Sequence, residues 1–451
     1  MIRLSDHFTY RRLLRYTFPS IIMLVFTSVY GVVDGFFVSN FVGKTPFAAV
    51  NFIMPFLMIL GCIGFMFGTG GSALISLTLG QGHPQKANEI FSLIVYASAF
   101  LGVIFAVLGF FLVEPVASLM GAEGQLLADS ILYGRIILLA LPFYVLQYEF
   151  QCLFATAEKP RLGLVVTVAA GLVNMALDAL FVAVFSWGLP GAAAATALSQ
   201  FIGGVYPLVY FSRKTPAGQS PSTLKLVKCR ISNRRFYAGA LLKTCSNGSS
   251  ELMSNISMSV VSMLYNVQLM KYAGENGIAA YGVLMYVSMI FQAVFLGYSV
   301  GSAPVAGYHH GAQNYDELRS LRRKSLLLIG IFSVLMFTAG ELSGRPLSVL
   351  FVGYDAGLLA LTAHAFSVFS FSFLFSGFAI FGSSFFTALN DGLTSALISF
   401  LRTFVFQISS VLVFPLFWGV DGIWFSVVFA EIMVVVITVF FLIIKQKKYQ
   451  Y

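Results

Sequence analysis

Long apolar runs alternate along this chain with short polar segments. A helix needs about 20 mostly apolar residues to cross the hydrocarbon core of a bilayer. The runs are continuously apolar and lack the period-2 alternation of membrane β-strands, which excludes a barrel. The pattern predicts twelve membrane-spanning helices, numbered here 1 to 12 in chain order, at residues 16–39, 50–79, 90–113, 130–154, 163–186, 190–212, 245–270, 279–308, 325–345, 358–386, 395–416 and 420–444.

Composition agrees with this pattern. Of the 451 residues, 58% are hydrophobic and 10% are charged, whereas soluble domains carry about 25% charged residues. The mean hydropathy is +0.86. The longest hydrophilic stretch, residues 213–243, is too short for a separate domain. We therefore expect an all-α integral membrane protein with an N-lobe at 1–212 (spans 1–6), a cytoplasmic basic linker at 213–243, and a C-lobe at 244–451 (spans 7–12).

Basic residues gather on one side of the predicted membrane. Both termini, the linker and every second connection carry most of the Lys and Arg residues, and the other connections carry few. Because basic loops stay in the cytoplasm, both termini are predicted to be cytoplasmic, in a multi-pass protein of the inner (plasma) membrane. The net charge of +9 then reflects membrane orientation. We expect the bilayer, and no nucleic acid, as its partner.

The sequence repeats itself at an offset of 231 residues. Small and apolar residues coincide near the start of the two halves, and a Trp-Gly-x-x-Gly motif coincides near their ends. The repeat predicts two six-helix bundles related by a pseudo-two-fold axis along the membrane normal, which enclose a cavity that can open to either side. The coinciding pairs include Gly43 with Gly274, Met54 with Met285, Gly80 with Gly311, Trp187 with Trp418 and Gly191 with Gly422.

Four polar residues of the N-lobe are predicted to lie at one depth in the outer half of the membrane. They are Asp34 in span 1, Asn174 and Asp178 in span 5, and Thr196 in span 6. Their oxygens suit a hard cation such as Na⁺, or a shared proton, because two neighbouring carboxylates do not both ionise readily. Helix-packing hydrogen bonds are the alternative for Asn174 or Thr196 alone. Two intramembrane aspartates at one depth are costly, which favours the functional interpretation.

Two further polar stripes are predicted to line the substrate cavity. Span 7 carries Glu251 and Asn255 on one helix face, with Tyr265 at its edge, and span 4 carries Tyr144, Gln147 and Gln151. For Ser and Thr on the same faces, packing between helices is an equally good interpretation. Glu149 points away from the span 4 stripe. Arg402 and Glu431 also fall inside spans, and the sequence assigns neither a partner.

Signals for an enzyme fail. Gly43-Lys44-Thr45 resembles the end of a phosphate-binding loop, but Val38 stands where the first glycine of that motif belongs. The histidines form no ligand pattern with acidic residues, and no nucleophile and base assemble. We expect no catalysis, no cofactor and no metal beyond a possible Na⁺ at the four N-lobe residues.

Several motifs together resemble the MATE (multidrug and toxic compound extrusion) transporter family. The resemblance covers essentially the whole chain, and the set in this order is specific. The span 7 segment is most similar to the bacterial branch often termed MepA-like. The motifs are VVDGFFVSNFVG at 32–43, LGQGHPQKA at 79–87, FQCLFATAEKP at 150–160, NMALDALF at 174–181, GLPGAAAATALSQ at 188–200, YHHGAQNYDEL at 308–318 and FFTALNDG at 385–392.

The resemblance implies a secondary active exporter that uses a proton or sodium gradient to expel cationic, amphipathic drugs or metabolites by alternating access. The family's N-lobe cation site, an Asp, an Asn, an Asp and a Thr, corresponds to Asp34, Asn174, Asp178 and Thr196. A bend-point proline corresponds to Pro19, although Pro19 could instead mark the helix entry. We expect a monomer.

One departure from the family pattern concerns the C-lobe. Branches with a second acidic site also have an Asp in helix 10, whereas span 10 here has no acid before Asp391 at its cytoplasmic end. A complete C-lobe cation site is therefore not expected. A lipid or polysaccharide flippase of the same superfamily is the alternative function, although such a protein should carry a basic cavity for phosphate.

Overall fold

Helices make up almost all of the computed structural model, which describes residues 2–213, 224–228, 234–353 and 355–451. The N-lobe contains α1 (Tyr10–Phe37), the π-helical η1 (Val38–Val42), α2 (Lys44–Gly61), α3 (Ile63–Gly80), α4 (Pro84–Leu119), α5 (Gly124–Thr156), α6 (Pro160–Asp178), the π-helical η2 (Ala179–Val184) and α7 (Leu189–Ser212). The C-lobe contains α8 (Arg234–Gly311), α9 (Tyr315–Val352), α10 (Ala356–Phe369), η4 (Ser370–Ser372), α11 (Phe373–Ala388), α12 (Gly392–Phe400), the π-helical η5 (Leu401–Gln407), α13 (Ile408–Val413), α14 (Pro415–Trp418), α15 (Val420–Ile444) and α16 (Gln446–Tyr449).

The predicted number of spans is confirmed once α8 is divided. Among the described residues, 11 helical runs are long and apolar enough to cross a membrane, and one of them is 77 residues long. That length corresponds to about 115 Å of helix, several times the thickness of the hydrocarbon core. Gly274 interrupts it with φ 63° and ψ −153°, so that α8 supplies spans 7 and 8. The chain is a multi-pass membrane protein with twelve spans.

The start of the C-lobe differs from the sequence expectation. Helix α8 begins at Arg234, within the segment expected to be a linker up to residue 243. Periodicity missed these residues because the first turns of α8 extend beyond the apolar run. Residues 214–223 and 229–233 of the expected linker lie outside the described part of the chain.

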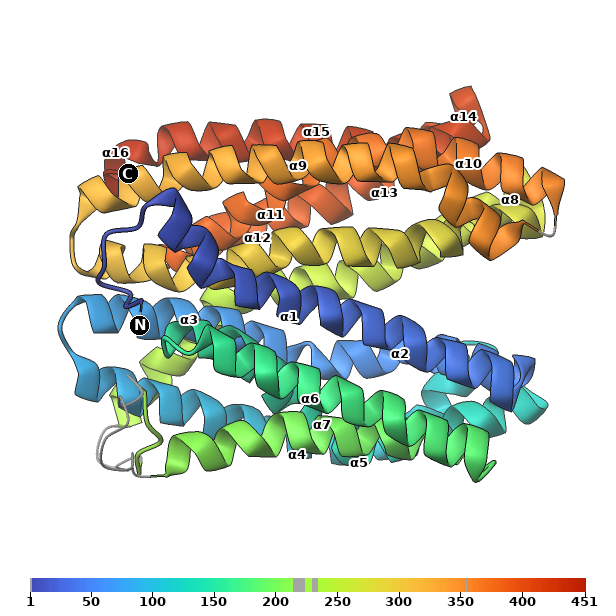
Figure 1. Cartoon of the computed structure of the whole chain (residues 1–451), viewed down its shortest axis with the longest axis horizontal. Helices are drawn as coiled ribbons and strands as arrows, with labels where there is room; N and C mark the ends of the chain where they lie inside the picture. Colours follow the sequence, from blue (N-terminus) through green and yellow to red (C-terminus); the bar gives the residue numbers. More distant parts are fainter. Residues whose placement is uncertain (1, 214–223, 229–233, 354) are drawn as a thin grey trace.

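The two lobes lie side by side, with both termini at the same end of the molecule (Figure 1). Their contact is symmetric. The backbone of Gly80 packs against the carbonyl of Tyr308, and Gly311 packs against the carbonyl of Leu77. Leu77 and Tyr308 are themselves related by the offset of 231, so each contact is the repeat of the other. Such reciprocal contacts are the mark of a two-fold relation.

Turn glycines repeat in the same way. Gly43 and Gly274 both have positive φ, of 123° and 63°, and Gly188 and Gly419 have φ values of 65° and 57°. A residue with a Cβ is strained at such angles, whereas glycine is not. These coincidences in the sequence therefore mark equivalent turns of the two lobes.

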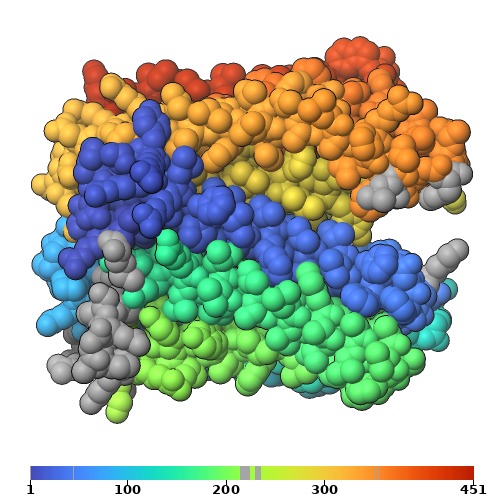
Figure 2. Space-filling model, viewed as in Figure 1, coloured from blue at the N-terminus to red at the C-terminus, as the bar shows by residue number. Residues whose placement is uncertain are grey.

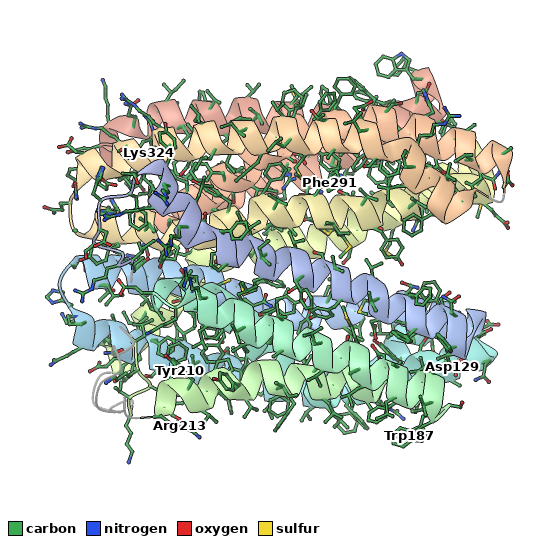
Figure 3. The ribbon with its side chains drawn as sticks, viewed as in Figure 1. Asp129, Trp187, Tyr210, Arg213, Phe291 and Lys324 are labelled. Carbon is green, nitrogen blue, oxygen red and sulfur yellow. The ribbon has the colours of Figure 1, made fainter. Side chains whose placement is uncertain are left out.

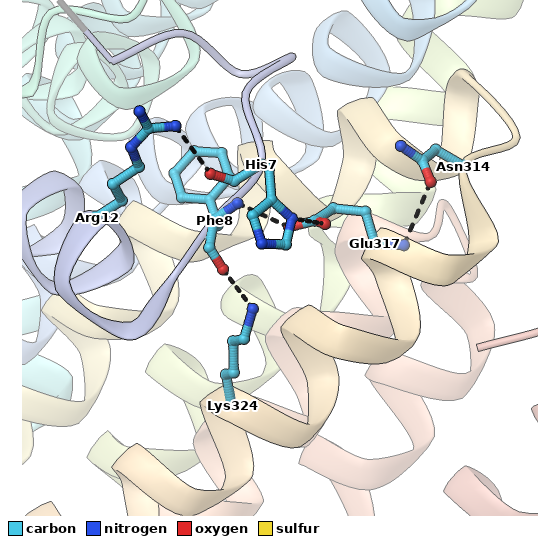
Figure 4. Close-up of polar contacts among 6 residues, drawn as sticks. All are labelled: His7, Phe8, Arg12, Asn314, Glu317 and Lys324. Atoms are coloured by element: carbon cyan, nitrogen blue, oxygen red, sulfur yellow. Dashed lines mark hydrogen bonds and ion pairs between the residues drawn. The ribbon is translucent and has the colours of Figure 1, made fainter.

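The lobes meet at the end that carries the termini and separate at the other end, where a cleft opens between them (Figure 2). The N-terminal segment reinforces the closed end (Figure 4). The Glu317 carboxylate, on α9 of the C-lobe, accepts hydrogen bonds from the Phe8 N–H at 2.8 Å and faces His7 Nδ1 at 2.6 Å. Lys324 Nζ donates to the Phe8 carbonyl at 2.5 Å. Phe8 is fully buried, so the segment before α1 is anchored to the opposite lobe.

The C-terminal residues are also anchored at this end. Lys445 Nζ and the Tyr449 hydroxyl donate to Asp391 Oδ2 at 2.8 and 2.9 Å, and Arg319 Nε donates to the Gln450 carbonyl at 3.0 Å. Burial opposes ionisation of Asp391, but the hydrogen bonds from Lys445, Tyr449 and Thr394 outweigh it and lower the pKa of this carboxyl below its usual value. Asp391 is thus a structural anchor at the end of span 10.

Candidate functional site

Interrupted helices position the four polar residues of the N-lobe. Asp34 lies in the last turn of α1, directly before η1, and Asp178 is the last residue of α6 before η2. A π-helical turn contains one more residue than an α-helical turn, which changes the direction of the side chains that follow, and such turns are frequent at functional sites. Both acids therefore lie where their helices change register.

The four side chains form one cluster. Thr196 Oγ1, on α7, donates to Asp34 Oδ1 at 3.3 Å, and Asn174 Nδ2 lies 3.5 Å from Thr196 Oγ1. Asn174 and Asp178 are buried, with exposed fractions of 1% and 0%. Both carboxylate oxygens of Asp178 and the amide oxygen of Asn174 make no hydrogen bond within the described part of the chain. The cluster therefore contains three buried oxygen acceptors without donors.

The charged groups of this cluster are both acidic. Asp34 and Asp178 lie in each other's field, and no basic side chain among the described residues contributes to the surroundings of either acid. Tyr133 of α5 is buried within electrostatic range of both carboxyl groups, and sequence reasoning missed it because nothing in the pattern of span 4 marks it. Among the described residues, no three His, Cys, Asp or Glu side chains are grouped to hold a metal ion. A cation bound here would use two carboxylates together with amide and hydroxyl oxygens.

Glu251 lies at a second site, between the lobes. It lines a cavity with a volume of about 30 Å³, which has room for one or two water molecules. The N-lobe contributes Thr69, Ser72 and Cys152 to this cavity, and the C-lobe contributes Glu251 and Thr387. The cavity belongs to the closed end of the molecule. Glu251 is therefore half-buried between the lobes in this conformation.

Of the other residues predicted to line the cavity, Tyr144 and Asn255 are half-buried and Gln147 and Gln151 are buried. Tyr144 is half-buried and packs edge-on against Tyr148, with ring centroids 4.7 Å apart. Gln147 and Gln151 are buried, with exposed fractions of 4% and 2%, and side-chain atoms of both make no hydrogen bond among the described residues. Asn255 is half-buried, and its amide donates to the Glu251 carbonyl at 2.8 Å.

Tyr265 does not join these residues. Its exposed fraction is 0%, its ring stacks on Tyr281 at 5.1 Å, and its hydroxyl lies 2.5 Å from Ser426 Oγ. Tyr265 was placed at the edge of a polar stripe, but the rotation of the helix turns it into the C-lobe core. Tyr265 therefore packs in the C-lobe core in this conformation, and its role in the substrate cavity stays a prediction.

Half-buried Arg402 and buried Glu431, which the sequence left without partners, form an ion pair. Arg402 lies in η5, and its Nε and Nη2 donate to Glu431 Oε1 on α15 at 3.0 and 2.5 Å. The positive charge of Arg402 also acts electrostatically on Glu251.

Glu149 of α5, which is predicted to point away from the span 4 stripe, is fully buried and accepts a hydrogen bond from the Ser98 hydroxyl.

Pro19 lies inside a helix. Thr9 caps the N-terminus of α1 and accepts from the Arg12 N–H, so that Pro19 is more than two turns from the helix start. The alternative that Pro19 marks the helix entry is therefore wrong. A proline in this position removes one backbone hydrogen bond from the helix.

Comparison with known proteins identifies the family. The sequence profile of the family MatE matches residues 19–180 and again residues 252–413. The two matches begin 233 residues apart (252 against 19), close to the offset of the repeat. The same profile thus describes both lobes. The chain belongs to the MatE family.

Relatives of this chain include the multidrug export protein MepA of two staphylococci. The protein from Staphylococcus saprophyticus is 23% identical over 94% of this chain and 91% of its own length, and that from Staphylococcus aureus strain MRSA252 is 21% identical over the same shares. These alignments span both lobes.

Solved structures share the fold. The outward-facing conformation of a multidrug resistance MATE family transporter of the MOP superfamily superimposes with a TM-score of 0.90 at 19% identity, covering 98% of this chain and 97% of the other. A MOP superfamily transporter from Pyrococcus furiosus, whose reversed binding-pocket polarity suggests a different function, superimposes with a TM-score of 0.88 at 19% identity, covering 99% and 98%. The fold alone therefore does not determine the substrate, which depends on the residues of the site.

Proposed function

We propose that this protein is a multidrug exporter that couples the outward movement of cationic amphipathic compounds to the inward movement of H⁺ or Na⁺. Membership of the MatE family and the relatives named as multidrug export proteins support export of drugs. The two-lobe architecture, with a cleft open at one end only, supports alternating access (Figure 2). Since one chain supplies both lobes, the transporting unit is a monomer.

The orientation follows from charge. Lys324 and Arg213 lie at the end that carries the termini, and Trp187 and Asp129 lie at the opposite end (Figure 3). The positive-inside rule assigns the basic end to the cytoplasm of the inner membrane. The open cleft then faces outward, which agrees with the outward-facing transporter among the structural neighbours.

The N-lobe cluster is the coupling site in this proposal. The observation that carries it is the buried carboxylate of Asp178, whose two oxygens receive no donor among the described residues and which lies within hydrogen-bonding reach of the second acid, Asp34. Two neighbouring carboxylates without a base repel each other, and H⁺ or Na⁺ relieves that repulsion. Occupancy by the ion and loading of drug into the open cleft would then alternate. Asn174 and Thr196 supply the remaining oxygen ligands for Na⁺.

Glu251 is the substrate-selecting acid. Its place between the lobes, with Thr69 and Ser72 on one side and Thr387 on the other, supports contact with a compound that moves through the interface. A carboxylate in this position attracts a lipophilic monocation by its opposite charge.

Reconstitution into proteoliposomes tests the coupling site. Efflux of a fluorescent cation is measured with a proton gradient and a sodium gradient imposed separately. We expect Asp34→Asn and Asp178→Asn to abolish gradient-driven efflux. Asp129→Asn, at the outer end of α5 and bonded to Gln125, should not change it. Full efflux by both cluster variants would refute the assignment, and the gradient that drives the wild type identifies the ion.

Glu251→Gln tests the substrate site. We expect a much larger loss of transport for a lipophilic cation than for a neutral compound of similar size, because only the cation loses its counter-charge. Glu123→Gln, on the surface, is the matched control. Equal losses for the two compounds would show that Glu251 serves structure or coupling.

A further inference from the structure

An open groove runs between α1 and α6 on the surface of the N-lobe, near the end that carries the termini. The two helices lie next to each other on the face shown in Figure 2. The groove has a volume of about 490 Å³. Its apolar walls include Leu14, Phe18, Pro19 and Val165, and its polar part consists of Arg15 and Arg161. The transport site described above uses none of these residues except Pro19.

The groove separates charge from apolar surface along its length. Both helices begin at the terminal end, so Arg15 precedes Phe18 on α1 by three residues and Arg161 precedes Val165 on α6 by four. Residues three and four apart lie on one helix face. The two guanidinium groups therefore lie at the membrane edge, and the apolar walls lie one turn deeper. Phe18 and Val165 are 58% and 63% exposed, as expected of side chains that face the bilayer.

The two arginines are available for a ligand. Both are exposed, and neither makes a hydrogen bond or ion pair in the part of the chain that the structure describes. The nearest carboxylate along the chain, Glu158, accepts a hydrogen bond from the Leu4 N–H at 2.7 Å. Two guanidinium groups at the rim of one groove repel each other, and an anion between them is stabilised. Guanidinium also matches the geometry of phosphate oxygens better than ammonium does.

We propose that this groove binds an anionic phospholipid of the leaflet on the terminal side. The headgroup phosphate lies between Arg15 and Arg161, and one acyl chain follows the apolar wall past Phe18 and Pro19. A zwitterionic lipid fits less well, because its ammonium group adds a positive charge beside two others. A cationic drug is disfavoured for the same reason. The bound chain packs beside Pro19, where α1 lacks one backbone hydrogen bond.

Lipid exchange on the purified full-length protein in nanodiscs tests the proposal. The probes are a phosphatidylglycerol, a phosphatidylcholine of the same chain length, and inorganic phosphate in place of a lipid. Retained lipid is measured by native mass spectrometry. We expect the wild type to prefer the phosphatidylglycerol and the double variant Arg15→Gln/Arg161→Gln to lose about 25-fold in that preference, because each basic residue near a membrane surface contributes a factor of about five.

A control double variant and a variant of the apolar wall complete the test. Arg323→Gln/Lys447→Gln removes two exposed charges at the same end of the other lobe and should keep the preference. Phe18→Ala/Val165→Ala should weaken retention of long-chain phosphatidylglycerol more than that of a short-chain analogue. Equal preference in the groove variant and the control variant would overturn the proposal. Displacement of the lipid by inorganic phosphate at equal concentration would reduce the site to an anion site and would also overturn it.

Discussion

The two lobes share a fold but handle intramembrane charge in opposite ways. In the N-lobe, Asp34 and Asp178 lie together without a base among the described residues. In the C-lobe, Glu431 is paired with Arg402, which belongs to the same lobe. At the repeat offset, Arg402 corresponds to Gly171 and Glu431 to Gln200. The C-lobe thus carries its own cation, whereas no basic side chain among the described residues pairs with the two N-lobe acids, which is the basis of the proposed coupling site.

The charges also lie at different heights. Arg402 is ten residues from the start of α12, or about 15 Å, whereas Asp178 is 18 residues from the start of α6, or about 27 Å. A π-helical segment accompanies each of them, η5 at Arg402 and η2 after Asp178. The two lobes use the same helix irregularity at different depths. An inherited scaffold can therefore carry two charge arrangements without a change in topology.

The largest effect is expected where the C-lobe cation is removed. Arg402→Gln leaves the Glu431 carboxylate buried and unpaired, which costs about 3–5 kcal/mol of stability. Arg402→Gln/Glu431→Gln removes both charges and should cost far less. Thermal unfolding of the purified protein measures both. Equal losses for the single and the double variant would contradict the assignment of the pair as the charge balance of this lobe.

Exchange of a helix-interior proline between the lobes should have the next largest effect. Pro19 of α1 corresponds to Ser250 of α8. Ser250→Pro should destabilise the C-lobe by about 3 kcal/mol, because it removes a helical hydrogen bond and clashes with the preceding turn.

Pro19→Ala should leave expression unchanged but abolish drug efflux, with Ser250→Ala as the control. Normal efflux by Pro19→Ala across the pH range would show that Pro19 takes no part in transport.

The symmetric contact at the closed end predicts equal effects in the two lobes. A Cβ at Gly80 or at Gly311 would meet a backbone carbonyl of the other lobe. We expect Gly80→Ala and Gly311→Ala each to destabilise the protein by about 1–3 kcal/mol. Gly282→Ala, where nothing lies within 4 Å of the new methyl group, should be neutral or slightly stabilising. A large difference between the first two melting temperatures would break the symmetry argument.

The smallest effect concerns Asp391, the C-lobe acid that ends span 10. Asp391→Asn loses the ion pair with Lys445, but the Lys445 side chain that remains is 24% exposed and can turn its ammonium group to water, so the loss should cost about 1 kcal/mol at neutral pH. Because the pKa of Asp391 is lowered in the folded protein, its contribution is present above its usual pKa of about 4 and is lost as the pH falls through the folded pKa. The difference in melting temperature between variant and wild type should therefore close progressively as the pH falls below about 4. A difference that persists in acid would exclude ionisation as its cause.

The sequence by itself determined the number of spans, the repeat and the four polar residues of the N-lobe cluster. These features are local or periodic. An apolar run of fixed length defines a span, and an offset relates equivalent positions. Depth along a helix follows from counting residues at a fixed rise. Asp34, Asn174, Asp178 and Thr196 could therefore be grouped before their contacts were known.

Only the tertiary structure decided which side chains meet. The pairing of Arg402 with Glu431, the approach of Tyr133 to the N-lobe acids and the burial of Tyr265 depend on the rotation of each helix about its axis. A π-helical turn alters that rotation, and a regular 3.6-residue period does not reveal it. The groove between α1 and α6 arises likewise from the packing of two helices that are distant in sequence. Contacts between helices depend on rotation and crossing, and residue order alone does not specify either one.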